Sequence, residues 1–303
     1  MRSYATMIMA QAGRKISFRT EGISLPNART APVINMLKYF LHEYGEFNCS
    51  KINVIQYDDF IYHDLGSLAF CKKSGAAPAV ELMPDTFFFE SRGYENIRDA
   101  VLSDKLPNWS QKQDIVFWRG SSTAHPTLSN GARISEINQI PRVNLCLTMK
   151  HIQNSDAAIM HSWGGFPFDH KEAVQWLCSK DIFRPGISML EHAKYRYLID
   201  IDGQACAWSF LEKLLLGSCV LKIKSPFEQW FYKNLVPWQH YIPIESDLSD
   251  LEEKITWCRT HENEAKEIGH EGQNFALCET LEVAGRKTIE SIAKTSIPMD
   301  SFL

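Results

Sequence analysis

The chain has 303 residues, of which 45% are hydrophobic, 12% aromatic and 22% charged, and its formal net charge is -4. This length suits one large domain or two ordinary ones, and the composition is that of a globular protein with a sizeable apolar core. The slight acidity argues against the broad basic surface of a nucleic-acid-binding protein, and no window approaches the ~18 consecutive apolar residues of a membrane-spanning helix.

The first third of the chain contains one clear helix and one clear strand. Residues 32–44 (PVINMLKYFLHEY) carry apolar residues at helical spacing and predict a helix. KINVIQYDDF at 51–60 is β-branched, ends in two acids and predicts a strand that leads into a loop. The aromatic run at 81–91 is interpreted as a buried connection. The polar stretch LSDKLPNWSQKQ at 102–113 is the predicted interdomain linker.

From residue 114 onward, strand-like apolar runs alternate with segments at helical spacing. Such alternation is typical of a parallel sheet covered by helices. Two such halves make an α/β protein with two Rossmann-like domains. The predicted strands are 114–122, 156–163, the two ends of 194–222, and 240–244, and the predicted helices are 131–139, the middle of 194–222, 225–235, 247–261 and 262–282.

The eight cysteines are scattered, and no pair has the spacing of a zinc knuckle or a redox-active Cys-x-x-Cys motif. We interpret them as free thiols in a reducing compartment. The N-terminal segment MRSYATMIMAQAGRKISF is too polar for a good signal peptide. We therefore expect a cytoplasmic protein, with contact at a membrane surface left open.

Ligands of open parallel sheets bind beyond the carboxyl ends of strands, and three predicted strand ends carry suitable polar residues. The first end holds Asp58 and Asp59, which follow KINVIQY. A carboxylate there can act as a general base if its pKa and position suit the reaction. The alternative is a turn acid or a helix cap.

The second strand end is Arg119, followed by Gly120, Ser121 and Ser122. The guanidinium supplies paired hydrogen-bond donors, and the turn supplies backbone N–H groups. This combination suits a phosphate group. The alternative is a structural salt bridge at Arg119.

The third strand end is Asp202-Gly203, in the stretch KYRYLIDIDGQACAWSFLEKLLLGSCVLK. Gly203 lets the chain turn sharply, and we expect a helix to begin near Gln204. A helix N-terminus favours anions through its dipole and free N–H groups, so the turn predicts a phosphate-bearing ligand. The alternative is an ordinary turn between a strand and a helix.

Several other enzyme classes are disfavoured by missing motifs. Neither a Gly-x-Gly-x-x-Gly fingerprint nor a Walker motif is present, which argues against a dinucleotide enzyme or a P-loop ATPase. No Gly-x-Ser-x-Gly elbow suggests a serine hydrolase. His170, His192 and His240 form no metal-binding motif, and surface or packing roles are favoured for them.

The runs KYRYLIDIDG…AWS…LLLGSCVLK and PFEQWFYKNLVPWQHYIPIESDLSDLEE resemble the family 90 glycosyltransferases. That family includes bacterial lipopolysaccharide and capsule glycosyltransferases, eukaryotic protein O-glucosyltransferases and fungal capsule xylosyltransferases. FWRGSS at 117–122 is similar to the family's Phe-Arg-Gly-Ser segment. The strong resemblance covers about residues 114–280, and the N-terminal third matches only loosely.

The resemblance implies a GT-B-like fold: two Rossmann-like domains with parallel sheets and a cleft between them. The implied domains are an acceptor-side domain at 1–112, a nucleotide-sugar-binding domain at 113–285 and a tail or helix at 286–303. Such enzymes move a sugar from a UDP-sugar to a hydroxyl, usually with inversion. They use no metal and no cofactor beyond the UDP-sugar itself. A saccharide or lipid-linked saccharide at the inner face of a bacterial membrane is the implied acceptor, with no nucleic-acid partner.

The family's site residues carry over to particular positions. Its base, an Asp at the end of an N-domain strand, corresponds to Asp58, with Asp59 as the near alternative. Asp202 and Glu228 are candidates for holding sugar or ribose hydroxyls, because carboxylates accept such bonds. Each is equally interpretable as a cap or a surface acid. The whole implied donor-binding set is Arg119, Gly120, Ser121, Asp202, Gly203, Ala205, Trp208, Ser209, Lys213 and Glu228.

One position departs from the family pattern. Relatives often carry an Arg in a Ser-x-Arg-Phe context just after the turn, where this chain has Ser209 and, at the preceding Ser position, Ala207. Lys213, one helical turn along, would share a face with that position and compensate, or it is a surface lysine. A degenerate family member that binds nucleotide or glycan without turnover is therefore the second hypothesis, and a different nucleotide-using enzyme is the third.

Overall fold

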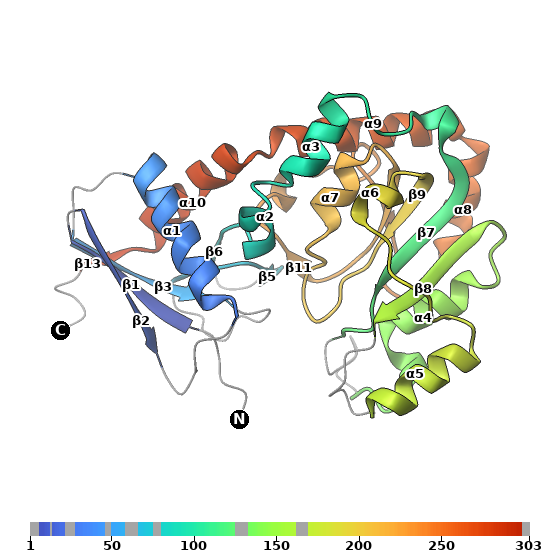
Figure 1. Cartoon of the computed structure of the whole chain (residues 1–303), viewed down its shortest axis with the longest axis horizontal. Coiled ribbons are helices and arrows are strands. Elements are labelled where there is room, and N and C mark those ends of the chain that lie inside the picture. Colours follow the sequence, from blue (N-terminus) through green and yellow to red (C-terminus); the bar gives the residue numbers. More distant parts are fainter. Residues whose placement is uncertain are drawn as a thin grey trace. The chain divides into compact units, whose positions relative to one another are not determined.

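The computed structural model describes residues 6–12, 14–21, 28–45, 50–57, 66–74, 80–124, 133–161 and 169–298. The chain divides into two compact units, coloured along the sequence in Figure 1. The first unit comprises Met1–Glu95, Pro226–Asn234 and Cys278–Leu303, and the second comprises Asn96–Ser225 and Leu235–Leu277.

The first unit contains a mixed sheet in which a hairpin is added to three parallel strands. The order is β2-β1-β3-β4-β6, and β13 also pairs with β3. β3, β4 and β6 run parallel, whereas β1 is antiparallel to both β2 and β3. The elements are β1 (Thr6–Ala12), β2 (Lys15–Glu21), α1 (Thr30–Tyr44), β3 (Ser50–Gln56), β4 (Ser67–Ala69), β5 (Lys72–Lys73), β6 (Val80–Leu82), α2 (Thr86–Glu90), β11 (Phe227–Glu228), η3 (Tyr232–Asn234), α10 (Leu281–Thr295) and β13 (Ile297–Pro298).

Two long helices of the first unit pack against each other. The predicted helix at 32–44 is confirmed as α1, whose buried side chains recur at helical spacing. Gly285 of α10 lies against Phe40 and Tyr44 of α1, and a Cβ on it would come within 2.5 Å of the Tyr44 ring. The glycine therefore permits the close approach of α1 and α10.

The second unit is built on a five-stranded, fully parallel sheet with the order β12-β10-β9-β7-β8. Figure 1 shows β7, β8 and β9 side by side. The predicted α/β class is thereby confirmed. The elements are α3 (Glu95–Leu102), η1 (Trp109–Gln111), β7 (Gln113–Ser121), η2 (Ile137–Gln139), α4 (Pro141–Met149), β8 (Ser155–His161), α5 (His170–Ser179), α6 (Met189–His192), β9 (Tyr195–Asp200), α7 (Phe210–Leu215), β10 (Cys219–Ile223), β12 (Ile242–Ile244), α8 (Leu251–Thr260) and α9 (Glu262–Cys278).

Both faces of this parallel sheet are covered. Tyr197 and Ile199 of β9 join a core with side chains of α4, α8 and α9, while Leu198, which points to the opposite face, is also fully buried. On that opposite face Phe117 of β7 contacts His192 of α6. Burial on both faces explains the continuous apolar runs of these strands in the sequence.

The segment 102–113, predicted as a linker, is packed into the second unit. Trp109 and Lys112 are buried. The Lys112 ammonium donates to the carbonyls of Ala193 (2.8 Å) and Leu216 (2.9 Å) and to the hydroxyl of Ser218 (3.0 Å). The chain passes between units after Glu95 and again near residues 226, 234 and 278, while the predicted functional domains at 1–112, 113–285 and 286–303 stay a prediction.

Two predicted helices are wrong in type or position. Residues 225–235 form β11 and η3, because β11 pairs antiparallel with β5 and this pairing overrides the helical spacing of the aromatic residues. The helix predicted at 131–139 is the short η2, and the full helix is α4, which begins at Pro141. A proline fits the first turn of a helix, so Pro141 was a start signal.

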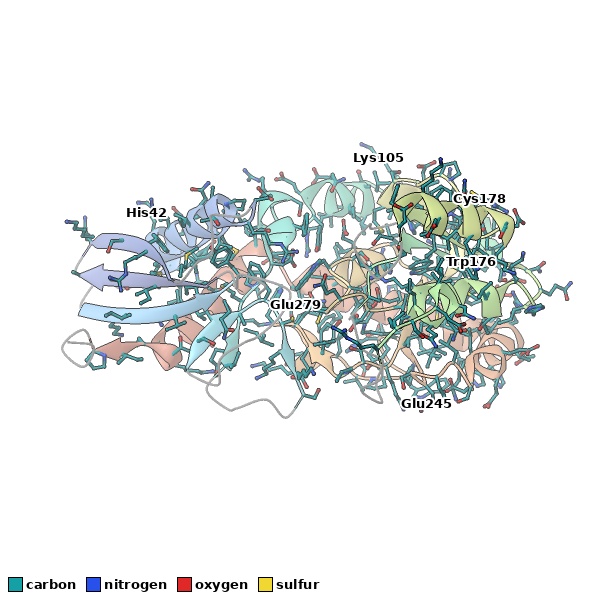
Figure 2. The ribbon with its side chains drawn as sticks, turned by 90° about the horizontal axis from the view of Figure 1, so that it is seen from below. His42, Lys105, Trp176, Cys178, Glu245 and Glu279 are labelled. Carbon is teal, nitrogen blue, oxygen red and sulfur yellow. The ribbon has the colours of Figure 1, made fainter. Side chains whose placement is uncertain are left out.

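The described part of the chain shows the state of the cysteines and the apolar character of the helices. The seven cysteines that the structure describes form no disulfide with one another, and Cys178 of α5 is exposed (Figure 2). Cys49 lies outside the described residues. In the described part of the chain, no helix combines the length and the apolar character needed to cross a membrane.

Candidate functional site

The candidate site lies where β7, β9 and β10 of the second unit end, which we call the carboxyl edge of the parallel sheet. Parallel strands end on the same side, so the segments that follow them meet there. The structure brings four predicted residues into one hydrogen-bonded cluster: Ser121, Asp202, Gly203 and Lys213. Three residues that the sequence analysis did not select complete this carboxyl-edge cluster: Arg142, Asp200 and Lys222.

Asp200 is the centre of the carboxyl-edge cluster. It is the last residue of β9 and is fully buried. Its two carboxylate oxygens accept from the ammonium groups of Lys213 and Lys222, each at 2.7 Å. Burial alone would raise the pKa of Asp200, but the two ammonium groups more than offset this, and the pKa lies below its ordinary value. Asp200 is therefore an ionised carboxylate shared by two buried lysines.

Asp202 also belongs to the cluster, and its side chain fixes the conformation of the segment that follows β9. Its Oδ1 accepts from the Ala207 backbone N–H (2.8 Å) and from Lys222 Nζ (3.2 Å). Its Oδ2 is buried and accepts no hydrogen bond from any residue that the structure describes. A buried acceptor left without a donor costs about 1–3 kcal/mol, so Oδ2 is a place where a ligand hydroxyl would be stabilised.

Arg142 of α4 ties the ends of β7 and β9 together. Its guanidinium donates to the Ser121 carbonyl and hydroxyl and to the Thr123 hydroxyl on one side. On the other side it donates to the carbonyls of Ile201 and Asp202. Burial lowers the pKa of Arg142, and the neighbouring carboxylates oppose this. Arginine still keeps its charge in proteins, so the guanidinium is a half-buried cation held in a fixed position.

Gly203 is required for space. A Cβ on it would lie 2.7 Å from Thr123 Oγ1 and 2.9 Å from Arg142 Cζ. The sequence analysis gave Gly203 the role of a sharp turn, and the structure adds this close approach of the Arg142 guanidinium. Gly120 is similarly confined, because a Cβ there would come within 2.6 Å of the Trp118 ring.

The helix expected near Gln204 begins six residues later, at Phe210, and this expectation was wrong. α7 has only six residues, and Ser209 at its N-cap makes no side-chain capping bond. The cause is local: Asp202 accepts from the Ala207 N–H, and the Gly203 N–H donates to the Ala205 carbonyl (3.0 Å), so residues 203–209 form a loop. The turn therefore does not place the N-terminus of a long helix beside Gly203.

Arg119 lies on β7 with only 7% of its side chain exposed. Its Nη2 donates to both carboxylate oxygens of Asp156 (2.8 and 2.9 Å), and the guanidinium stacks over the Phe117 ring at 4.8 Å. The salt bridge that the sequence left open as the alternative is therefore present. Phosphate binding by Arg119 stays a prediction.

Lys213 is a buried member of the cluster, with 5% of its side chain exposed. Burial lowers its pKa, and the carboxylate of Asp200 opposes this. The surface-lysine alternative is thereby excluded. Of the other predicted donor residues, Ala205 is buried, while Trp208 and Ser209 are half-buried on the loop.

The remaining predicted site residues do not join this cluster or lie outside the described chain. Glu228 is on β11 of the first unit, where its carboxylate accepts from the Ser74 hydroxyl (2.6 Å). Asp58 and Asp59, the predicted catalytic residues, lie outside the described residues. His192 is a packing residue, since burial lowers its pKa to about 4 and its ring contacts Phe117.

The carboxyl-edge cluster holds one more cation than it holds carboxylates: Arg142, Lys213 and Lys222 against Asp200 and Asp202. A buried excess of positive charge favours an anionic ligand. The missed members had a sequence signal, because Asp200 and Lys222 are charged residues at the ends of otherwise apolar strands. For Arg142 the sequence contains no such signal apart from its position in the first turn of a helix.

Curated proteins similar to this chain include protein O-glucosyltransferases. Protein O-glucosyltransferase 2 of Danio rerio is 35% identical over 170 residues, which are 56% of this chain and 30% of that protein. Protein O-glucosyltransferase 3 of Homo sapiens is 32% identical over 186 residues, 61% of this chain and 32% of that protein. The alignments thus span about a third of the length of these relatives.

Solved structures similar to this fold include two bound to uridine nucleotides. Anabaena HepE in complex with UDP-glucose has a TM-score of 0.46 at 12% identity, over 77% of this chain and 64% of that chain. The pneumococcal O-GlcNAc transferase GtfA in complex with UDP and GlcNAc has a TM-score of 0.38 at 9% identity, over 84% and 63%.

A sequence match to one family covers more than half of the chain. Residues 90–283 match glycosyl transferase family 90. The matched range includes the whole carboxyl-edge cluster and the parallel sheet that carries it. The chain belongs to glycosyl transferase family 90.

Proposed function

We propose that the chain is a glycosyltransferase that moves a hexose or pentose from a UDP-sugar to a hydroxyl of a glycan acceptor, with inversion and without a metal ion. The observation that carries the proposal is the carboxyl-edge cluster, in which two buried lysines and the half-buried Arg142 face two carboxylates in a member of family 90. An excess cationic charge at this edge suits the diphosphate of a nucleotide-sugar.

The cluster is suited to stabilise the leaving group. As the sugar–oxygen bond of the donor breaks, negative charge develops on UDP, and fixed positive groups lower the energy of that state without having to reorganise. Lys213 and Lys222 are held by Asp200, and Arg142 is held by five acceptors, so their positions are set before the donor arrives. In this proposal Lys213 takes the place of the family arginine that is absent at Ser209.

Two carboxylates are assigned to hydroxyl groups. The Oδ2 of Asp202, which lacks a donor among the described residues, accepts a hydroxyl of the ribose or the sugar. Asp58, with Asp59 as the alternative, takes the proton from the acceptor hydroxyl as its oxygen bonds to the anomeric carbon and UDP departs. The assignment of Asp58 comes from the resemblance to family 90 alone.

The acceptor proposed is a saccharide of lipopolysaccharide or capsule, free or lipid-linked, met at the cytoplasmic face of a bacterial membrane. This follows the bacterial branch of the family resemblance. The curated relatives are named for protein O-glucosylation, so a serine-bearing polypeptide is the acceptor to test against it.

A second candidate is a family member that binds UDP or a glycan without turnover. It is favoured by the bidentate ion pair of Arg119 with Asp156, which engages the predicted phosphate ligand, and by Ser209 in place of the family arginine. The two candidates differ in whether a catalytic base is needed.

The proposal is tested by measuring UDP release from a set of UDP-sugars in EDTA, with saccharide and polypeptide acceptors supplied in turn. We expect release from one UDP-sugar, accelerated by a saccharide, and a loss of about 10²–10⁴-fold in Asp58→Asn, as for removal of a general base. Asp59→Asn tests the near alternative: the same loss there, with activity kept in Asp58→Asn, would make Asp59 the base. Tight UDP binding with no release for any acceptor would favour the binding protein instead.

A further inference from the structure

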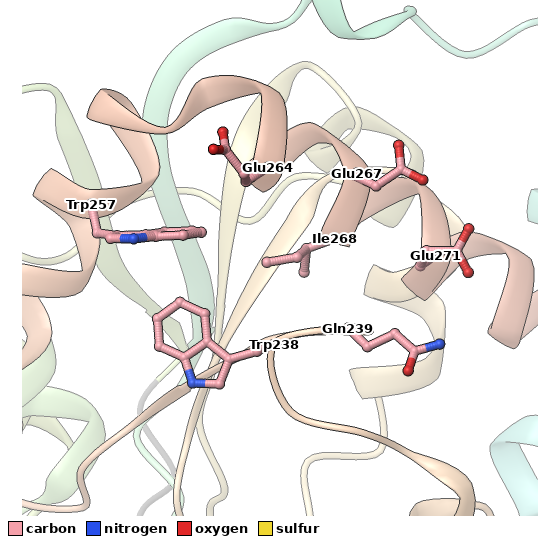
Figure 3. Close-up of a pocket in the computed structure, with 7 residues that line it drawn as sticks. All are labelled: Trp238, Gln239, Trp257, Glu264, Glu267, Ile268 and Glu271. Carbon is pink, nitrogen blue, oxygen red and sulfur yellow. The ribbon is translucent and has the colours of Figure 1, made fainter.

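The second unit has a pocket of about 380 Å³ at the side of its parallel sheet opposite the carboxyl edge (Figure 3). Trp238 and Gln239, which line it, precede β12, whereas Asp202 and Gly203 follow β9. β12, β10 and β9 run parallel, so the residues before one strand and after another lie at opposite edges. We call this side the amino edge. The pocket is therefore separate from the candidate donor site.

Two tryptophans form the apolar wall of the pocket. Trp238 is 42% exposed, and its backbone has φ = 65°, in the left-handed region that a bulky residue rarely adopts. The centroids of the Trp238 and Trp257 rings lie 4.9 Å apart, with the rings edge to face. Figure 3 shows the two rings next to each other, and Ile268 provides further apolar surface beside them. Strained backbone conformations and exposed apolar side chains are both more frequent at ligand-binding sites.

Polar groups without internal partners surround this wall. Glu264, Glu267 and Glu271 line one side of the pocket from successive turns of α9. Within the described residues, the carboxylates of Glu264 and Glu267 and the side-chain amide of Gln239 make no hydrogen bond or ion pair, whereas Glu271 accepts from Asn274 at 3.3 Å. The pocket thus offers free acceptors, and Gln239 adds a donor.

We propose that this pocket binds a neutral saccharide. The apolar face of a sugar ring packs on an indole, and its hydroxyls donate to the Glu264 and Glu267 carboxylates and exchange hydrogen bonds with Gln239. A volume of about 380 Å³ lies within the ~300–1,000 Å³ range of small-molecule pockets. The proposal concerns saccharide binding at the amino edge and does not depend on the identity of the donor.

A cationic ligand is the competing occupant, because carboxylates beside aromatic rings also suit a cation. The ring contacts favour the saccharide. The Lys254 ammonium already lies 5.1 Å from the Trp238 ring centroid and would repel a second cation. One face of Trp257 is stacked on His261 at 4.9 Å, so the two indoles do not present the open ring faces of a cation cage. A sugar needs only the remaining exposed surface of Trp238.

The test is titration of the full chain with neutral trisaccharides of glucose, xylose and mannose, followed through the indole N–H signals in NMR spectra. The chain has eight tryptophans, and Trp238→Phe removes one signal and so assigns it. We expect at least one trisaccharide to shift the Trp238 and Trp257 signals. We expect its affinity to fall about tenfold in Trp238→Phe and less in Glu267→Gln.

Matched controls separate this pocket from the surface in general. Trp176 on α5 also has a lysine over its ring, Lys180 at 5.6 Å, and Glu290 on α10 is likewise exposed. Trp176→Phe and Glu290→Gln should leave saccharide affinity unchanged. Choline and a lysine tripeptide are titrated in parallel as cationic probes.

Three results would overturn the proposal: no trisaccharide shifts the Trp238 signal at millimolar concentration, Trp238→Phe binds as tightly as the unaltered chain, or only the cationic probes shift these signals. UDP titrated into the same samples keeps the two proposals apart. UDP affinity should be the same in Trp238→Phe and in the unaltered chain. A lack of UDP binding would count against the donor site and not against this pocket.

Discussion

Buried lysines occur at both edges of the same parallel sheet, but their ammonium groups have different partners at the two edges. At the amino edge, Lys112 donates to two carbonyls and a hydroxyl, and no carboxylate of the described residues pairs with it. Burial lowers the pKa of Lys112 to about 7. At the carboxyl edge, Lys213 and Lys222 share the carboxylate of Asp200, whose pKa lies below its ordinary value despite burial.

The difference shows what each edge is built for. Lys112 holds the starts of β9 and β10 together through neutral acceptors, and a neutral amine there loses little of that role. The carboxyl-edge cluster keeps Asp200, Lys213 and Lys222 buried, with Arg142 and Asp202 half-buried beside them, and buried charges are costly unless each is well paired. The cluster holds more cations than carboxylates, and the diphosphate ligand that we propose would offset this surplus.

The largest effect is expected from removing the shared carboxylate. Asp200→Asn removes the carboxylate that pairs with buried Lys213 and leaves Lys222 with the longer contact to Asp202, and the free energy of unfolding should fall by about 3–5 kcal/mol, measured by urea denaturation. The control is Glu245→Gln, which removes the partner of the exposed Lys224 and should cost about 0–1 kcal/mol. A cost below about 1 kcal/mol for Asp200→Asn would show that the cluster is not held by this carboxylate.

The next effect is a pH dependence from Lys112. Its pKa is 10.5 in the unfolded chain and about 7 in the folded one, so between these values the unfolded chain binds more protons. The free energy of unfolding should therefore rise as pH rises from about 7 to about 10.5, by a few kcal/mol at most. Urea midpoints across this range measure it, and Lys112→Met should lose this part of the slope. An identical slope in Lys112→Met would contradict the assignment.

A smaller effect is expected from crowding the guanidinium of Arg142. In Gly203→Ala the new methyl group would lie 2.9 Å from Arg142 Cζ, so the side chain must move, at a cost of about 1–3 kcal/mol. The affinity for UDP, measured by calorimetry, should fall as the Arg142 side chain moves. Arg142→Lys keeps the charge but loses the fork of donors, and should weaken UDP binding as well. Unchanged stability and affinity in Gly203→Ala would remove Gly203 from the site.

The smallest effect is expected at the exposed amino-edge pocket. Glu267 makes no hydrogen bond or ion pair with the described residues, so Glu267→Gln should change the free energy of unfolding by no more than about 0.5 kcal/mol. Urea denaturation beside Asp200→Asn gives a direct contrast between the two edges. A loss comparable to that of Asp200→Asn would mean that Glu267 is part of the folded structure's internal pairing.

The sequence was sufficient for the elements whose signal is local. α1 and the alternation of strands and helices after residue 114 follow from apolar spacing, which reports burial directly. The start of α7 could not be predicted from the sequence. The side chain of Asp202 accepts a hydrogen bond from the Ala207 N–H, and the helix therefore begins only at Phe210. The hairpin of β1 and β2 likewise depends on pairing with β3 across the sheet.

The candidate site was partly predictable for the same reason. Strand ends placed Ser121, Asp202 and Gly203 correctly at the carboxyl edge, and helical spacing selected Lys213. Arg142 reaches Asp202 from 60 residues away, and no local pattern announces such a contact. The ion pair of Arg119 with Asp156 is a cross-strand contact that its motif could not reveal.

The most direct test of the central claim is calorimetric titration of UDP and of uridine into the unaltered chain in EDTA. If the surplus cations of the carboxyl-edge cluster hold the diphosphate, UDP should bind at least about 100-fold more tightly than uridine, a difference of about 2.7 kcal/mol in binding free energy. Added salt should reduce this difference in affinity. Equal affinity for the two, or no binding of UDP, would contradict the account.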